Sequence, residues 1–447
     1  MSVDGSVEAR HDFVLRSVED RGVRFVRLWF VDVLGSLKSM AIPVSELASA
    51  LEDGVGVDGS SLEGSVRLAE RDVIAHPDPL TFQILPWRPG SLVARMFCEV
   101  RGPDGRPFAA DSRLALTRVV RQAAELGFSF EVGSEIEFFL YAAPPGDGSA
   151  RGVEDALPVA LDEGAYFDLT ALDVGSDFRR RTIEYLEQMG IPVKSAHHEV
   201  APSQHELDLQ HTDALSMADA LMTFRLAVKE AARTVGCYAT FMPQPVEGQP
   251  GSGMHLHLSL FDADGNAFYS PDQAEVLSPV GRAFLAGILA HGPELCAVTN
   301  QWVNSYKRLA NGFEAPQHVS WTRHGRSALV RVPSLRRDRP GGARIELRSP
   351  DPAANPYLVF ALVLGAGLRG IERGYELEAE TVDEAGPLTR RLPRDLDEAT
   401  DLFDASELAR DTLGDRLCDW YVLNKRREWA EYSTTVSSYE RRRYLRL

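Results

Sequence analysis

Two acidic side chains, Glu135 and Glu137, stand two positions apart in an apolar run that predicts a β-strand. Side chains alternate between the two faces of a strand, so both carboxylates point the same way and Ile136 points the other way. Two carboxylates on one face are costly to bury without a partner. The pair is therefore either the wet face of a strand or a set of hard oxygen ligands for Mg²⁺ or Mn²⁺.

A second predicted strand, at residues 254–260, carries polar side chains on one face only. Alternation places His255, His257 and Ser259 together and leaves leucines on the opposite face. A single histidine on a strand is usually a hydrogen-bonded core residue, whereas two histidines and a serine are more typical of a lined cavity. The pattern alone leaves both interpretations open.

A third predicted strand, at residues 343–348, alternates in the same way. Arg344, Glu346 and Arg348 share one face. They form either a surface ion-pair ladder of little energetic weight or one metal carboxylate flanked by two anion-binding guanidinium groups. Two further acids, Glu199 and Glu206, are predicted to lie in a loop between helices, from which they could join the strand carboxylates around one metal cluster.

A basic stretch from Asn304 to Arg331 surrounds one isolated acid, Glu314, in a loop bounded by glycine and proline. The charges fit a solvated face, but the loop has the composition of a lid over a site. The sequence has no Walker A loop, and no G-x-G-x-x-G follows a predicted strand. Metals and arginines must therefore hold the phosphates if a nucleotide binds.

The elements that position these residues divide into two regions, which predict a small domain at 13–107 and a larger one at 108–447. In the first region we expect a short helix at 12–20, strands at 23–31, 37–43, 79–85 and 92–100, a helix at 44–53 and a plain turn at 58–61. In the second we expect helices at 114–126, 172–189, 213–235, 278–290, 356–373 and 406–431. Strands and helices do not alternate strictly, which favours an α+β fold over a doubly wound sheet.

Composition limits the partners of this chain. Its 447 residues carry a formal net charge of −17, which argues against nucleic acid or an anionic membrane as the main partner. Four widely spaced cysteines form no metal-type pattern, so we expect neither a thiol metal site nor a disulfide framework, and a cytoplasmic location fits. The N-terminus has no signal-peptide pattern, and the longest apolar run is too short to span a bilayer.

Taken together, the motifs resemble bacterial class I glutamine synthetases, in the shorter subtype that lacks the adenylylation motif. The match runs in order from Phe13 to Tyr444. The motifs that carry it are Asp58-Gly59-Ser60-Ser61, Glu135-Ile136-Glu137, His197-His198-Glu199-Val200-Ala201-Pro202, Gly251-Ser252-Gly253-Met254-His255, Asn304-Ser305-Tyr306-Lys307-Arg308 and Asp351-Pro352-Ala353-Ala354-Asn355-Pro356-Tyr357.

The resemblance implies a β-grasp N-terminal domain and a larger catalytic domain with an antiparallel sheet flanked by helices. It implies a dodecamer of two stacked hexamers, with active sites between neighbouring subunits. It also implies ATP as co-substrate and two Mg²⁺ or Mn²⁺ ions per site. By motif, the ligands of the metal near the glutamate are Glu137, Glu199 and Glu206, and those of the metal near ATP are Glu135, His255 and Glu346.

The reaction implied by the resemblance is ATP-dependent ligation of glutamate and ammonia. ATP phosphorylates the γ-carboxylate of glutamate, and an amine nitrogen then attacks the acyl phosphate. By motif, the catalytic residues are Asp58, Glu314 and Arg326. The substrate-binding residues are Ser61, Glu137, Tyr166, Glu199, Gly251, His255, Arg308, Arg331 and Arg348, of which Ser61, like Asp58, comes from the neighbouring subunit. The nucleotide contacts are His257, Ser259, Arg344 and, where the family usually has an acid, Lys194.

Three other departures from the family pattern concern the substrates. Val57 and Ser65 replace aromatic residues beside the amine pocket, and Pro250 replaces an asparagine that contacts glutamate. The smaller side chains leave open an organic amine as acceptor, which would give a γ-glutamyl-polyamine or a γ-glutamyl-monoamide such as the ethanolamide. A catalytically inactive sensor of nitrogen status is a third alternative, against which the intact set of metal ligands argues.

Overall fold

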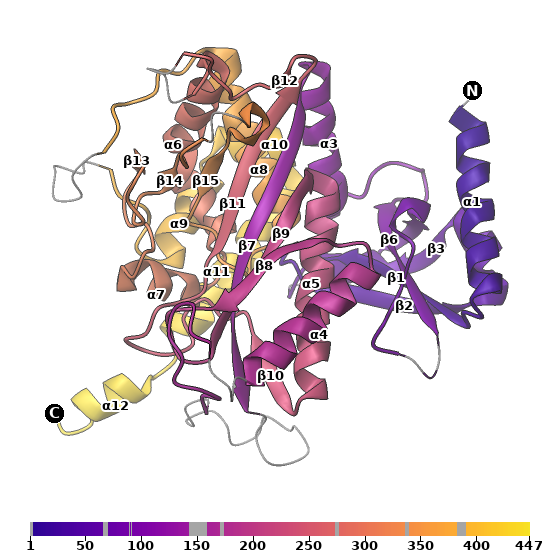
Figure 1. The fold of residues 1–447 in the computed structure, drawn as a ribbon, viewed down its shortest axis with the longest axis horizontal. Helices are drawn as coiled ribbons and strands as arrows, with labels where there is room; N and C mark the ends of the chain where they lie inside the picture. Colours follow the sequence, from indigo (N-terminus) through magenta and orange to yellow (C-terminus); the bar gives the residue numbers. More distant parts are fainter. Residues whose placement is uncertain are drawn as a thin grey trace.

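The computed structural model describes residues 3–65, 70–88, 90, 92–142, 159–169, 174–272, 277–335, 339–381 and 390–447. These residues form two sheets with their helices, and the smaller sheet lies to one side of the larger one (Figure 1). Because helices and strands are mixed without strict alternation, the predicted α+β fold class is confirmed.

The smaller sheet has, among the described residues, the strand order β2-β1-β6-β4-β3, with β5 paired to β6. Strands β1 and β6 are parallel and the other pairs are antiparallel. Its helices share a buried apolar core with the sheet. The elements are α1 (Val3–Asp20), β1 (Phe25–Val31), β2 (Leu37–Pro43), α2 (Leu47–Asp53), β3 (Val55–Asp58), β4 (Asp72–Pro77), β5 (Gln83–Ile84) and β6 (Val93–Arg101).

Three predictions in this region need correction. The helix predicted at 12–20 already begins at Val3. The strand predicted at 79–85 is a 3₁₀ turn over Pro79–Thr81 followed by the two-residue β5, because the Asp78 side chain accepts from the backbone N–H of Leu80 and starts a turn there. Strands β3 and β4 were not predicted, and Asp58 is the last residue of β3.

The larger sheet has, among the described residues, the strand order β13-β14-β15-β11-β7-β9-β8, with β10 paired to β7 and β12 paired to β11. All pairs are antiparallel except β13–β14. The strands are β7 (Ser129–Ala142), β8 (Val193–His198), β9 (Gln204–Asp213), β10 (Cys237–Thr240), β11 (Met254–Asp262), β12 (Gly265–Asn266), β13 (Trp321–Thr322), β14 (Val330–Arg331) and β15 (Ile345–Leu347).

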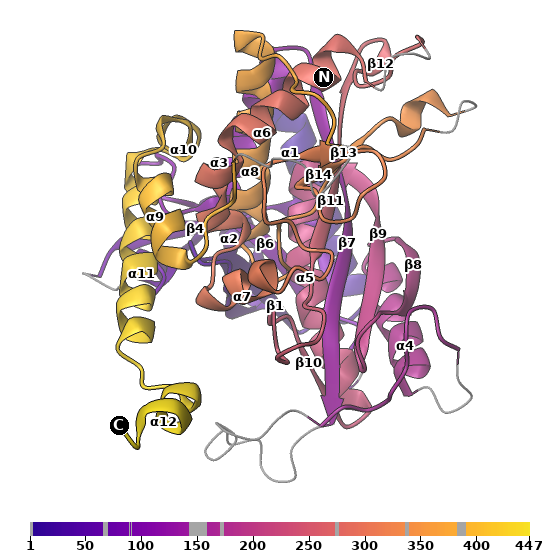
Figure 2. The same cartoon turned by 90° about the vertical axis from the view of Figure 1, so that its left-hand side faces the viewer.

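Helices lie mainly behind one face of this sheet, as Figure 2 shows for α3, α6 and α8. The helix predicted at 278–290 continues to Thr299, and the helix predicted at 406–431 is two helices separated at Gly414, whose φ is 86°. The helices are α3 (Ser112–Glu125), α4 (Val174–Gln188), α5 (Ala214–Thr234), α6 (Pro279–Thr299), α7 (Val303–Asn311), α8 (Pro356–Arg373), α9 (Leu396–Asp404), α10 (Glu407–Leu413), α11 (Asp415–Ser433) and α12 (Ser438–Tyr444).

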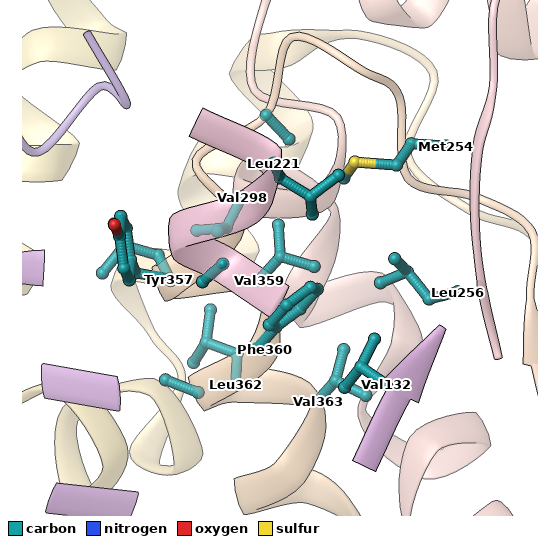
Figure 3. Packing of buried hydrophobic residues seen from close by; sticks show 14 of the residues in the cluster. Val132, Leu221, Met254, Leu256, Val298, Tyr357, Val359, Phe360, Leu362 and Val363 are labelled. Carbon is teal, nitrogen blue, oxygen red and sulfur yellow. The ribbon is translucent and has the colours of Figure 1, made fainter. Parts of the chain in front are cut away.

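The central helix of the core is α8, which is apolar around most of its circumference. Phe360 and Val363 of α8 pack near Val132 and Leu256 of the sheet (Figure 3). Helix α6 lies unusually close to α8, since a Cβ on Gly370 would stand 2.2 Å from the carbonyl oxygen of a residue in α6. One face of the large sheet is therefore sealed by packed helices, which leaves the other face for chemistry.

Buried polar contacts fasten the two sheets to each other. Asn355 caps α8 and donates from Nδ2 to the carbonyl oxygen of Asp32 at 3.2 Å. Arg113 of α3 donates to Asp78 beside the smaller sheet at 2.8 Å and to Asp219 of α5 at 3.0 Å. These contacts fix the smaller unit against the larger one. Within the described residues, every helix is too short or too polar to span a lipid bilayer.

Candidate active site

A cavity of about 720 Å³ opens on the face of the large sheet that faces away from α8. Strand register brings its lining together, because His255 on β11 pairs with Glu135 on β7, and Glu137 pairs with Glu206 on β9. Negatively and positively charged side chains both line the cavity. The charged lining residues are the acids Glu135, Glu137, Glu199, Glu206, Asp208, Glu314 and Glu346 and the bases Arg323, Arg326, Arg331, Arg344 and Arg348.

The first possible cation-binding group is formed by Glu135, His255 and Glu346, whose ligand atoms lie within 4.8 Å of one another. His255 Nδ1 lies 3.3 Å from Glu135 Oε2 and 3.9 Å from Glu346 Oε1. The structure therefore brings together the three residues that the sequence assigned to one metal. Burial alone would raise the pKa of Glu135, but hydrogen bonds from His255 and His257 outweigh it and lower that pKa.

The second group is formed by His197, Glu199 and Glu206, whose ligand atoms also lie within 4.8 Å of one another. His197 Nε2 lies 2.9 Å from Glu199 Oε1 and 3.7 Å from Glu206 Oε1. Glu137 was predicted in this set. It lies opposite Glu206 in the sheet, and its Oε2 accepts from Gly253 N at 2.8 Å.

These carboxylates are crowded where water is scarce. Burial, followed by the neighbouring Glu199, raises the pKa of Glu137. Burial, followed by the Glu137 and Glu135 carboxylates, raises the pKa of Glu206. Like charges that cannot all ionise together are stabilised by a cation between them, and oxygen donors with an imidazole suit Mg²⁺ or Mn²⁺. The residues present therefore fit divalent cations.

Arginines line the cavity next to the first group. The guanidinium groups of Arg331 and Arg348 each bond to Glu346, which is fully buried. The Arg326 guanidinium lies 2.8 Å from Glu314 Oε1, which joins the loop after α7 to the arginine side. Guanidinium groups that line a cavity are suited to hold carboxylate or phosphate oxygens.

A loop at residues 161–168 brings aromatic rings to the mouth of the cavity. Tyr166 is 42% exposed and lines the cavity, as its neighbour Phe167 does. Phe167 stacks on His197 with ring centroids 4.4 Å apart, so the loop contacts the second cation-binding group. The loop is bounded on one side by residues 143–158, which lie outside the described residues.

The expected nucleotide contacts lie beside the first group. His257 Nε2 lies 2.6 Å from Glu135 Oε1, and Arg344 donates to His257 Nδ1 at 3.2 Å. Ser259 lies further along β11 and donates to the carbonyl oxygen of Ala343. Lys194 is exposed on β8, with Nζ 3.7 Å from Asp208 Oδ2.

Two residues expected to bind glutamate lie behind the cavity lining. Arg308 is 4% exposed and donates to the carbonyl oxygens of Ser349 and Arg348. The carbonyl oxygen of Gly251 accepts from Gln204 at 3.0 Å. The side chain of Arg308 and the backbone of Gly251 thus support the cavity wall, next to Gly253 and Glu137.

The structure does not bring Asp58 and Ser61 into this cavity. Asp58 lies at the end of β3 in the smaller sheet, where its carboxylate accepts from the backbone and hydroxyl of Ser60. The following turn is fixed to α11, because the side chain of Asn424 accepts from Ser65 N at 2.7 Å. Neither Asp58 nor Ser61 is among the residues that line the cavity.

His197 and Asp208 are among the cavity residues that were missed at the sequence level, and the placement of Glu199 and Glu206 was wrong. Glu206 lies on β9 and Glu199 follows β8 directly, so they are not part of a loop between helices. Once β8 and β9 are recognised as strands, alternation places His197 next to Glu206, and Asp208 on the same face as Glu206. Asp208 is 7% exposed and bonds to the hydroxyl of Ser195.

Two carboxylate–histidine groups and several arginines in one cavity are typical of an enzyme that handles phosphoryl groups through divalent cations. The comparisons with known proteins agree. The family model "Glutamine synthetase, beta-Grasp domain" matches residues 22–103, and "Glutamine synthetase, catalytic domain" matches residues 109–444. The chain belongs to the glutamine synthetase family. It is thus a ligase, of a family that uses ATP and a divalent metal.

Relatives match along nearly the whole chain. A glutamine synthetase of Mycobacterium bovis is 51% identical over 99% of this chain and 100% of the relative. A glutamine synthetase of Methanosarcina mazei is 44% identical over 97% of each chain. A solved structure described as a GmaS/ADP complex is 32% identical, covers 97% of this chain and 99% of its own, and has a TM-score of 0.86.

Proposed function

We propose that this enzyme joins glutamate and ammonia in an ATP-dependent reaction through γ-glutamyl phosphate. The observation that carries the proposal is the cavity itself, which two carboxylate–histidine groups and a set of arginines line together in a chain of this family. A free carboxylate resists attack by an amine because oxide is a poor leaving group. Phosphorylation turns that oxygen into phosphate, which leaves readily.

The arginines would stabilise the moving charge. Arg326 and Arg331 would bind the transferring phosphoryl group, and Arg348 would orient the carboxylate of glutamate, with Arg308 supporting it from behind. His257, Ser259 and Arg344 would contact the nucleotide, and Lys194 would lie at its edge. Bound divalent cations, two per site and Mg²⁺ or Mn²⁺, would neutralise phosphate oxygens. Their ligands would be Glu135, His255 and Glu346 for one, and Glu137, Glu199 and Glu206 for the other, with His197 adjacent.

The acceptor nitrogen would enter on the side of the second group. Tyr166 and Glu199 would form the wall of the amine pocket, and Glu314 would close over it and exclude water. Ser61 would also line the amine pocket, and Asp58 would accept the proton that ammonium must lose before its nitrogen attacks.

Because Asp58 lies outside the cavity of its own chain, we include an oligomer in the proposal. A second copy would place its Asp58 loop at the mouth of the cavity, in a dodecamer of two stacked hexamers. The active site would then be complete only between chains. We also propose that the two domains comprise residues 13–107 and 108–447. The proposed location is the cytoplasm.

An amine panel tests the proposal. The purified protein is given ATP, Mg²⁺ and glutamate with ammonia, putrescine, spermine or ethanolamine, while phosphate release and the amide product are measured. Glutamine formation at millimolar ammonia supports the proposal. Turnover with an organic amine and none with ammonia would refute it in favour of the second candidate.

The second candidate is a γ-glutamyl-polyamine or γ-glutamyl-monoamide synthetase with the same phosphoryl chemistry. The observation that favours it is the small side chain on either side of the Asp58 loop, Val57 before it and Ser65 after it. Space next to a proton acceptor would admit the carbon chain of an organic amine.

A further inference from the structure

The loop at residues 161–168, which carries Tyr166, is fastened to the turn that carries Glu199. The fastening centres on Asp162, whose Oδ1 accepts three hydrogen bonds. His198 Nε2 donates at 2.9 Å, the backbone nitrogen of Ser203 at 2.9 Å and that of Gly164 at 3.1 Å. One carboxylate oxygen therefore joins the loop to both ends of the β8–β9 turn.

The histidine in this contact is held from two sides. His198 is 3% exposed, and its second ring nitrogen, Nδ1, donates to the carbonyl oxygen of Glu199 at 2.7 Å. An oxygen acceptor faces each ring nitrogen, so the ring is held between the Asp162 carboxylate and the backbone of Glu199. The carbonyl of Glu199 is thereby fixed along with the loop.

Two backbone contacts extend the link towards the cavity. The backbone nitrogen of Leu161 donates to Ser203 Oγ at 2.6 Å, and that of Phe167 donates to the carbonyl oxygen of His198 at 3.1 Å. Ser203 and Phe167 both have a φ of 62°, in the left-handed region. Such strained conformations persist only where the surroundings determine them, which these contacts do.

We propose that Asp162 and His198 are positioning residues for the acceptor amine, because they hold the Tyr166 loop on the Glu199 turn before the amine arrives. Neither side chain lines the cavity, so both act through other residues. The inference rests on the proposed function, which assigns the wall of the amine pocket to Tyr166 and Glu199. Because the Tyr166 loop is already ordered, none of the free energy of amine binding is used to order it.

Steady-state kinetics of Asp162→Ala test the inference. The KM for the amine is expected to rise about tenfold, as for a site that must order a loop on binding, while the KM values for ATP and glutamate and the kcat at saturating amine stay close to wild type. The matched control is Asp168→Ala in the same loop. Among the described residues, the Asp168 side chain accepts from Ala165 N at 3.0 Å and from no residue of the turn, so its loss should leave the amine KM unchanged.

Two further variants separate positioning from stability. Asp162→Asn keeps an acceptor oxygen for the same donors and should restore most of the amine affinity. Gly164→Ala removes no polar group, but its Cβ would stand 2.7 Å from His198 Nε2 and displace the ring. It should therefore raise the amine KM in the same way, even where Asp162→Ala does not fold.

The outcomes distinguish the two levels of the proposal. A wild-type protein that makes no γ-glutamyl amide refutes the proposed function and this inference with it. A wild type that makes the amide, while Asp162→Ala and Gly164→Ala keep its amine KM or raise all three KM values equally, refutes the inference alone.

Discussion

Glu314 is held in a left-handed backbone conformation, with a φ of 55°, in the loop that follows α7. Its carboxylate pairs with Arg326 across the cavity mouth at 2.8 Å. Replacing it with alanine should leave ATP binding intact and lower the rate of amide formation by about 100-fold, the size of effect seen when one aligned charged group is lost at a reacting centre. Nucleotide titration and product analysis measure the two effects separately.

The control for Glu314→Ala is Glu380→Ala, which breaks a neighbouring ion pair. Glu380 lies 2.8 Å from Arg323, and it does not line the cavity. Losing the Glu380 carboxylate should disturb the segment that carries Arg323 and Arg326 to a similar degree, but it removes no charge from the proposed amine pocket. Unchanged turnover in Glu314→Ala would exclude the lid role, and an equal loss in both variants would assign the effect to loop order.

Glu137 provides a prediction for pH. Without a cation, burial and the Glu199 carboxylate raise its pKa to about 8, above the ordinary value for glutamate. The folded, cation-free protein is thus most stable with this carboxyl protonated, and it loses stability as the pH rises through about 8. A divalent cation must displace that proton, so its affinity should fall by roughly tenfold per pH unit below that value for each proton displaced.

The protein is first freed of metal with a chelator and then titrated with Mn²⁺ in a calorimeter. Repeating the titration in two buffers of different ionisation enthalpy measures the number of protons released. We expect the wild-type protein to release protons when it binds Mn²⁺ at pH 7. A Glu206→Gln variant should release fewer protons, because that change removes one of the crowded carboxylates. Mn²⁺ binding that is independent of pH and releases no protons would contradict the prediction.

A site residue can be predicted from the sequence only where the residues around it alternate clearly enough to identify a strand. Glu135, His255 and Glu346 stand in runs that alternate without interruption, so their shared face follows from period two alone. His197 stands in a short run that ends at Pro202 and Ser203, and the left-handed Ser203 closes a hairpin that resembles a loop in sequence. The alternation was present there, but nothing local identified the strand.

At the scale of elements, the strands of the large sheet act as a frame that sets the spacing of ligands. Adjacent antiparallel strands place directly opposite residues about 4.5–5.5 Å apart, close to the distance over which one cation is shared. Helix lengths were predicted less well. Pro293 lies inside α6, yet α6 continues to Thr299, because packing against α8 outweighs the local preference.

The close contact of α6 with α8 gives a prediction about stability. Gly370→Ala should lower the free energy of unfolding by about 2–3 kcal/mol, because its Cβ would meet backbone atoms of α6, including the carbonyl oxygen of Ala283 at 2.2 Å. Denaturant unfolding measures the change. Gly341→Ala is the control, since its Cβ would have no atom within 4 Å. Equal stability of the two variants would show that the helices separate without cost.

At the scale of the whole molecule, the chain divides its chemistry between two sheets that do not share one cavity. The cation-binding groups belong to the large sheet, and Asp58 belongs to the smaller one, where Asn424 of α11 holds the turn that follows it. No sequence pattern predicts this separation, because distance between domains depends on how they pack. The family resemblance supplied the expectation that a neighbouring chain provides Asp58.

Mixed oligomers test whether a neighbouring chain completes the site. Asp58→Ala and Glu135→Ala chains should each be inactive alone, because one lacks the proposed proton acceptor and the other a proposed cation ligand. If each site forms between two chains, random mixing gives about a quarter of sites an intact cavity from one chain and an intact Asp58 from the next. Coexpressed, separately tagged chains purified by both tags should therefore recover about a quarter of wild-type turnover.

One control mixture decides the meaning of the mixed activity. Mixing Glu135→Ala with Glu346→Ala chains changes the same cation-binding group in every chain, so no pairing restores a site and turnover should stay at the level of the parents. Activity in that control would reveal contaminating wild-type enzyme. If Asp58→Ala and Glu135→Ala mixtures also stay inactive while forming oligomers, the Asp58 loop does not act on a neighbouring cavity. The proton from ammonium would then have to be taken up by a group in the same chain, such as Glu199 or Glu314.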